Sequence, residues 1–283
     1  MLTLENLSFR YLKPFDNAVD GVSAAIPCGI HLLLGENGAG KTTLLRLMAG
    51  LLPPDSGCCL IDGEDTADRR PSVIRRIFFL PDDMQIPTRD IRGFAEIHSC
   101  YYPCFDSDVF DRNLAEFGLT GHEDVASLSL GMRHKTFLAY VIALGVDLLL
   151  LDEPANGLDI TSKKALRTML ARNIGENQTV IISTHTVSDL RELYDGLIVM
   201  SHGRLLLCCP TWEIAGKVRC IATPIPPVER IFMDQEAGMF RSIVVNDTGE
   251  ASDVNYGLIY SALLSPARDG LLSILNTESD DKE

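Results

Sequence analysis

The sequence has no uninterrupted apolar run near the roughly 18 residues that a membrane-spanning helix needs, so we expect no membrane span. It also lacks an N-terminal apolar segment of the kind that directs secretion. Positive charge is scarce, since 25 Lys and Arg stand against 39 Asp and Glu, for a formal net charge of −14. Such a protein repels phosphate backbones and anionic lipid, so no nucleic acid is expected as a direct partner.

The eight cysteines lack the pattern of a disulfide framework or a zinc site. Four of them form the adjacent pairs 58–59 and 208–209, which do not suit ordinary disulfide geometry. Cys100 and Cys104 have helical spacing, but Pro103 lies between them and no His or Cys pair completes a zinc set. We therefore expect reduced thiols in a cytosolic protein.

The most informative stretch is 35–43, GENGAGKTT, which fits the phosphate-binding pattern Gly-x-x-x-x-Gly-Lys-Thr. The apolar residues 30–34 predict a buried strand before it, and residues 43–49 predict a helix after it. A strand, a glycine turn and a helix start make an anion site, because backbone N–H groups converge there and the helix adds partial positive charge. Lys41 would reach the β- and γ-phosphates, and the Thr42 hydroxyl would hold Mg²⁺. The predicted contacts with the nucleotide are Gly35, Asn37, Gly38, Ala39, Gly40, Lys41, Thr42 and Thr43.

Acidic side chains and a histidine follow two other apolar runs. Asp152 ends the run at 148–151 and can hold Mg²⁺ through water, as the second acidic element of a P-loop ATPase. Glu153 is one step further on, where it can orient or deprotonate the water that attacks the γ-phosphate. His185 follows the run at 180–184 and can hydrogen-bond the γ-phosphate, sensing whether it is present.

Apolar strands alternate with helical segments in the second half of the chain, which predicts an α/β fold with a mostly parallel sheet. Ligands of such sheets gather at the carboxyl ends of the strands, so the glycine loop, the acidic pair and His185 are expected at one edge. Between about 88 and 145 the pattern is helical. The aromatic residues Tyr101, Tyr102 and Phe105 could form a face for a partner, but we expect them to pack within the subdomain. The helices are predicted at 88–102, 107–117, 130–144, 162–173 and 187–193.

Five motifs occur in one order: the glycine loop, Leu128-Ser129-Leu130-Gly131-Met132, residues 147–154, Asn156-Gly157-Leu158-Asp159, and Ser183-Thr184-His185. Together they resemble the nucleotide-binding domain of ATP-binding cassette (ABC) proteins over roughly residues 1–210. The resemblance implies a P-loop ATPase core with a mostly parallel sheet, an antiparallel β subdomain and a helical subdomain at about 88–145. Residues 211–283 would form a small accessory C-terminal lobe.

The resemblance also implies roles for single residues. Tyr11 corresponds to the aromatic residue that stacks on adenine. Ser129 and Gly131 match the signature loop, which in the family completes the nucleotide site of the opposite subunit, so that two domains close head to tail on two ATP molecules. Asp159 matches the segment that lets the two sites communicate. A hydroxyl group and helix-start amides are what a γ-phosphate needs from across such an interface.

Two departures from the family pattern affect these expectations. The usual signature is Leu-Ser-Gly-Gly-Gln, and here Leu130 and Met132 replace a glycine and the glutamine. The family also places a glutamine after the strand predicted at 77–80, where it touches Mg²⁺ and couples nucleotide state to the membrane partner. We align Asp82 with that glutamine, although Gln85 could take the role if the loop moves. A carboxylate can bind the metal, but it adds negative charge beside a triphosphate.

The resulting hypothesis is an ATP-binding and ATP-hydrolysing subunit of an ABC transporter, peripheral on the cytoplasmic face of the membrane. It would pair with a second ABC ATPase domain, identical or different, and drive a separate integral membrane permease. The methionine of the signature loop and the short C-terminal lobe resemble exporter-type ATPases. Two alternatives stay open: a soluble ABC ATPase without a permease, and a regulatory subunit that hydrolyses ATP poorly, which Asp82 and Leu130 would explain.

Overall fold

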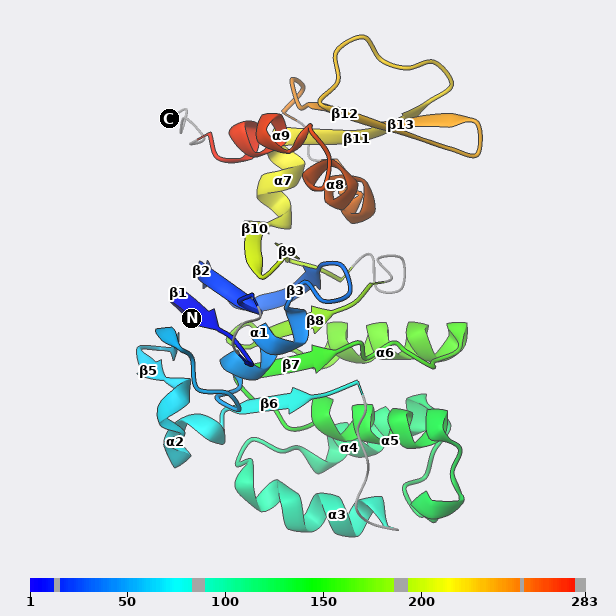
Figure 1. Ribbon diagram of the computed structural model, residues 1–283. Helices are drawn as coiled ribbons and strands as arrows, with labels where there is room; N and C mark the ends of the chain where they lie inside the picture. The colour runs from blue at the N-terminus through cyan, green and yellow to red at the C-terminus, as the bar shows by residue number, and fades with distance from the viewer. Residues whose placement is uncertain (13–15, 83–89, 186–192, 250–251, 278–283) are drawn as a thin grey trace. The chain divides into compact units, whose positions relative to one another are not determined.

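The computed structural model describes residues 1–12, 16–82, 90–185, 193–249 and 252–277 (Figure 1). The chain divides into two compact units. The first comprises Met1–Tyr194 with Met200–Leu205, and the second comprises Asp195–Val199 with Leu206–Glu283. No single helix in the described part is long and apolar enough to cross a membrane, and only the bent pair of α8 (Tyr256–Leu263) and α9 (Arg268–Leu275) meets that test on combined length and composition.

The largest sheet has six strands in the order β10-β9-β3-β8-β7-β6. The pairs β3–β8, β8–β7 and β7–β6 are parallel, so the carboxyl ends of these four strands lie at one edge. Nearly every side chain of β7 and β8 is buried, because helices cover both faces of a parallel sheet. The strands are β3 (Gly29–Leu34), β6 (Ile77–Leu80), β7 (Leu148–Asp152), β8 (Thr179–Ser183), β9 (Gly196–Ser201) and β10 (Arg204–Pro210).

A second, antiparallel sheet has the order β2-β1-β4-β5. In β1 and β2 buried residues are interspersed with exposed ones, as expected of a sheet packed on one face only, although register shifts interrupt strict alternation. The strands are β1 (Leu2–Phe9), β2 (Val19–Ile26), β4 (Ser56–Ile61) and β5 (Glu64–Asp65). Helices of this unit are α1 (Lys41–Met48), α2 (Pro71–Ile74), α3 (Ile91–His98), α4 (Ser107–Glu116), α5 (Leu130–Ile142) and α6 (Ile160–Asn173).

Helices α3, α4 and α5 gather beyond the β6 edge of the sheet (Figure 1). Their contact is aromatic: Phe94 of α3 packs on Phe137 and Tyr140 of α5, with ring centroids 5.9 and 5.4 Å apart. Phe78 of β6 joins this cluster at 6.2 Å from Phe137. The cluster therefore ties the helical part of the chain to the strand that precedes Asp82.

Most of the helix predictions agree with the structure. The segments expected at 107–117 and 130–144 are α4 and α5, and the helix expected at 162 begins two residues earlier, because the side chain of Asp159 caps it. Tyr101 was expected to pack, and that prediction was wrong, since its side chain is 70% exposed. The predicted helix at 187–193 and the alternative residue Gln85 fall largely or wholly outside the described residues.

The second unit contains a three-stranded antiparallel sheet in the order β11-β13-β12. The sequence pattern did not predict the sheet of this unit, because its strands are partly exposed. Its elements are α7 (Thr211–Lys217), β11 (Val218–Thr223), β12 (Phe232–Glu236), β13 (Met239–Val245), α8 (Tyr256–Leu263) and α9 (Arg268–Leu275).

Candidate functional site

The glycine loop connects the end of β3 to the start of α1, and two of its glycines are required by close packing. A Cβ atom on Gly40 would lie 2.2 Å from the carbonyl oxygen of Ala18, at a φ of +99° that other residues rarely adopt. A Cβ atom on Gly35 would lie 2.8 Å from the carbonyl oxygen of Met200. The loop is thus fixed from both sides in a tight turn before the helix start.

Lys41 folds back over this loop. Its Nζ donates hydrogen bonds to the carbonyl oxygens of Gly35 at 2.7 Å and Glu36 at 3.2 Å. Burial lowers the pKa of Lys41, and the carboxylates of Glu153 and Asp152 raise it in part. The ammonium group is held by two neutral acceptors, and anionic oxygens would hydrogen-bond it more strongly.

Thr42 and Asp152 place a hydroxyl and a carboxylate side by side. The Thr42 Oγ1 donates to Asp152 Oδ2 at 2.6 Å, and Ser183 Oγ donates to the other carboxylate oxygen. The register of β7 and β8 pairs Asp152 directly with Ser183, which is fully buried, so the carboxylate is oriented from the neighbouring strand. Oxygen donors of this kind suit a hard cation such as Mg²⁺, which keeps several of its waters.

Glu153 has a φ of +50°, a left-handed backbone conformation that costs a residue with a side chain about 1–3 kcal/mol. Its N–H donates to the Ser183 carbonyl oxygen at 3.0 Å. Its carboxylate accepts a hydrogen bond from Nδ1 of His185 at 2.9 Å, and the His185 backbone N–H lies 3.4 Å from the second oxygen. The turn at Glu153 therefore directs the carboxylate to the strand edge where His185 lies.

Tyr11 is linked to the first turn of α1. Its hydroxyl shares a hydrogen bond with Thr43 Oγ1 at 3.1 Å, and its ring meets Phe9 edge to face with centroids 5.0 Å apart. The Tyr11 side chain is nevertheless 52% exposed, so ring surface is available to a planar group beside the loop.

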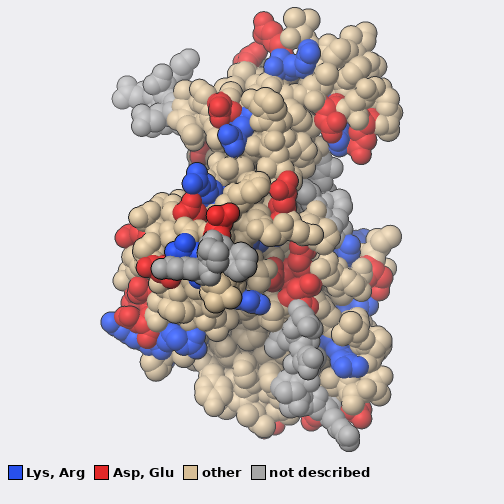
Figure 2. Space-filling model, viewed as in Figure 1, with Lys and Arg blue, Asp and Glu red and all other residues tan. Residues whose placement is uncertain are grey.

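These side chains line one cavity of about 490 Å³. The predicted residues that line it are Tyr11, Asn37, Gly38, Gly40, Lys41, Thr42, Thr43, Asp82, Asp152, Glu153 and His185. Three further residues line it that were not predicted to contact the nucleotide: Ala18, Glu36 and Asn156. On the face in view, small groups of Lys and Arg and small groups of Asp and Glu both occur among uncharged residues (Figure 2).

Asp82 lies in this cavity with the catalytic candidates. Its Oδ1 accepts a hydrogen bond from Nδ2 of Asn156 at 3.1 Å. Asn156 belongs to the turn that follows Glu153, so the end of β6 is joined to the end of β7 through these two side chains. The Asp82 carboxylate therefore lies in the same cavity as Lys41 and Thr42.

We expect Asp82→Asn to tighten the binding of ATP without Mg²⁺ about 3- to 10-fold, because it removes a nearby negative charge while an oxygen remains to accept the bond from Asn156. Titration calorimetry with ATP in EDTA measures the effect. The exposed Asp108→Asn in α4 is the matched control. Equal affinities for Asp82→Asn and the native protein would show that Asp82 does not face the phosphates.

Five predicted residues do not line the cavity: Gly35 and Ala39 of the glycine loop, Ser129, Gly131 and Asp159. Ser129 is the N-cap of α5, and its Oγ accepts the Met132 N–H at 3.3 Å. Asp159 caps α6 and pairs with Lys135 at 3.1 Å. The amide of Ser162 and then Lys135 lower the pKa of Asp159 to about 2.

Comparison with known proteins places this chain in a family. The family model for ABC transporters matches residues 19–156. The chain is 32% identical over 217 residues to the ABC transporter ATP-binding protein NatA of Bacillus subtilis, which covers 73% of this chain and 88% of that protein. It is 30% identical to the daunorubicin/doxorubicin resistance ATP-binding protein DrrA of Streptomyces peucetius, over 71% of this chain and 63% of that protein.

Among solved structures, cbiO1 from Clostridium perfringens, described as part of the ABC transporter complex cbiONQ, superposes with a TM-score of 0.60. It is 26% identical over 74% of this chain and 88% of its own. By these matches and by the cavity that its glycine loop forms, the chain belongs to the ATP-binding subunits of ABC transporters, ATPases whose hydrolysis of ATP powers transport.

Proposed function

We propose that the cavity at the β3, β6, β7 and β8 ends is where the chain binds and hydrolyses MgATP. The observation that carries this proposal is the convergence of Lys41, Thr42, Asp152 and Glu153 on one cavity. These four groups supply a phosphate-binding cation, two metal ligands and a base, which together are what phosphoryl transfer to water requires. Tyr11 provides the surface on which adenine stacks.

The residues present fit Mg²⁺, since Thr42 Oγ1 and Asp152 Oδ2 are two oxygen atoms of the kind that bind this metal, and they lie only 2.6 Å apart. Held by these residues, Mg²⁺ would supply positive charge that offsets the charge of the phosphates. Lys41 releases the two carbonyl groups of the loop and binds phosphate oxygens. Glu153 accepts a proton from the attacking water, and His185 holds the Glu153 carboxylate through the 2.9 Å hydrogen bond.

The second part of the proposal is an ATP-dependent dimer. Ser129 and Gly131 are at the start of α5, outside their own subunit's cavity, and Ser129 is exposed. A helix start with a hydroxyl and free amides is suited to an anionic oxygen. This supports a closed pair in which the α5 start of each subunit contacts the γ-phosphate held by the other, with Asp159 near the same interface.

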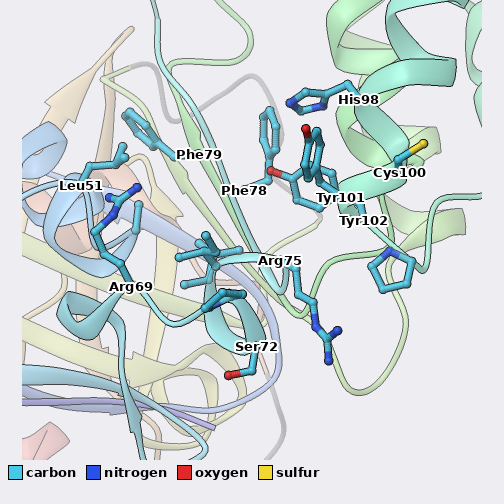
Figure 3. Close-up of a pocket in the computed structure, with 15 residues that line it drawn as sticks. Leu51, Arg69, Ser72, Arg75, Phe78, Phe79, His98, Cys100, Tyr101 and Tyr102 are labelled. Carbon is cyan, nitrogen blue, oxygen red and sulfur yellow. The ribbon is translucent and has the colours of Figure 1, made fainter.

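The third part is a membrane permease as partner, with this chain on the cytoplasmic face. A separate cavity of about 680 Å³ lies beside β6 and the helical subdomain (Figure 3). Aromatic residues line it on one side, and Arg69 and Arg75 add positive charge. We infer that it receives a short helix of the permease with an apolar face and a carboxylate. The strand that lines it, β6, leads directly to Asp82 in the nucleotide cavity.

Co-purification from detergent-solubilised membranes of the source cells tests this partner. The native chain should retain a polytopic membrane protein. Tyr101→Glu, at a 70% exposed position of the cavity, should lose it, whereas Trp212→Glu, 73% exposed in the other unit, should keep it. A ribosome in place of a permease, or equal retention by both variants, would contradict the proposal.

A further inference from the structure

One face of α5 lies against the turn that carries the catalytic carboxylate. Gly131, His134 and Lys135 are spaced i, i+3 and i+4, so they share a face of the helix. A Cβ atom on Gly131 would lie 3.6 Å from the carbonyl oxygen of Gly157, and Lys135 pairs with Asp159 at 3.1 Å. The helix that begins at the signature loop therefore contacts several points of the 153–159 turn.

The most central of these contacts is made by His134. Its Nε2 lies 2.9 Å from the carbonyl oxygen of Pro154. Because a carbonyl oxygen only accepts hydrogen bonds, Nε2 carries the hydrogen. Burial lowers the pKa of His134, while the bond to Pro154 and the charge of Asp82 raise it in part. The imidazole is half-buried and directed at the backbone of the turn.

Pro154 is a sensitive place for such a contact. It is buried and has no N–H, so its carbonyl oxygen is its only backbone polar group and needs a partner. It directly follows Glu153, whose backbone is in the left-handed region at φ +50°. A strained conformation persists only where its surroundings fix it, and His134 fixes the residue next to it.

We propose that His134 is a positioning residue that links the start of α5 to the Glu153 carboxylate. When the start of α5 binds the γ-phosphate held by the opposite subunit, the hydrogen bond from His134 connects α5 to Pro154. The Glu153 backbone is thereby held in the conformation that hydrolysis requires. The inference rests on the proposed function, because it uses the ATP-dependent dimer. It adds a route by which each subunit's catalytic base depends on the nucleotide of the other site.

The test compares His134→Leu, His134→Gln and the control His122→Leu, which makes the same change at an exposed histidine of the same subdomain. His134→Leu should lower kcat about 5- to 10-fold, the effect of losing one hydrogen bond, with the KM for ATP within about 2-fold of native. A glutamine amide lies at nearly the reach of imidazole Nε2, so His134→Gln should recover most of kcat. His122→Leu should match the native protein. Each rate is divided by the concentration of folded protein, and a thermal melt gives the folded fraction of each variant.

A second measurement separates this inference from the proposed function. In the Glu153→Gln background, His134→Leu should still form an ATP-dependent dimer on a sizing column, because it leaves the ATP contacts in place. Unchanged kcat in His134→Leu, or equal losses in the Leu and Gln variants, would overturn the positioning role while the dimer stands. A Glu153→Gln protein that stays monomeric in ATP would instead overturn the proposed function.

Discussion

Replacing Lys41 with alanine is expected to weaken MgATP binding about 100-fold or more. Lys41 Nζ already donates two hydrogen bonds, to the carbonyl groups of Gly35 and Glu36, and it would transfer them to phosphate oxygens. Hydrogen bonds between ionised partners are roughly twice as strong as neutral ones, and two of them account for a loss of about 3 kcal/mol or more. Titration calorimetry with MgATP measures the Kd.

The control for this prediction is Lys164→Ala, which removes an exposed lysine of α6 away from the cavity. It should bind MgATP as the native chain does. Because Lys41 is only 8% exposed, alanine also leaves space in the loop, and a thermal melt must show that the variant is folded. Native affinity in folded Lys41→Ala would remove the phosphate-loop assignment.

The sheet edge could be predicted from sequence because its determinants are local. The apolar runs before Gly35, Asp152 and His185 are long enough to specify buried strands, and parallel strands bring their carboxyl ends together. For this reason Asp152 and Glu153 could be placed beside the glycine loop, although Asp152 and Thr42 are 110 residues apart in the sequence.

Contacts that join segments without a shared pattern could not be predicted. Nothing in the residues around His134 or Pro154 signals their hydrogen bond, which depends on how α5 lies against the turn 20 residues away. The bond between Tyr11 and Thr43 is of the same kind. The strands of the second unit were not predicted because their residues have intermediate burial, so they show neither strict alternation nor a continuous apolar run.

The other large effect is expected for Glu153→Gln, which should lower kcat about 10²- to 10⁴-fold, the range for loss of a general base. The amide has nearly the same size, but it cannot accept the proton of the attacking water. Its oxygen can still accept the hydrogen bond from His185 Nδ1, so the turn should keep its geometry. ATP contacts made by Lys41 and Thr42 are untouched, and the KM for ATP should change little.

Because binding continues while hydrolysis stops, Glu153→Gln should accumulate the closed dimer in MgATP and run at twice the monomer mass on a sizing column. Glu176→Gln, at an exposed position before β8, is the matched control and should turn over ATP normally without a stable dimer. In EDTA the Glu153→Gln dimer should dissociate if Thr42 and Asp152 hold the metal that steadies the phosphates. Normal hydrolysis by Glu153→Gln would show that another group activates the water, and the neighbouring Asp152 and Asp82 would then be the residues to replace.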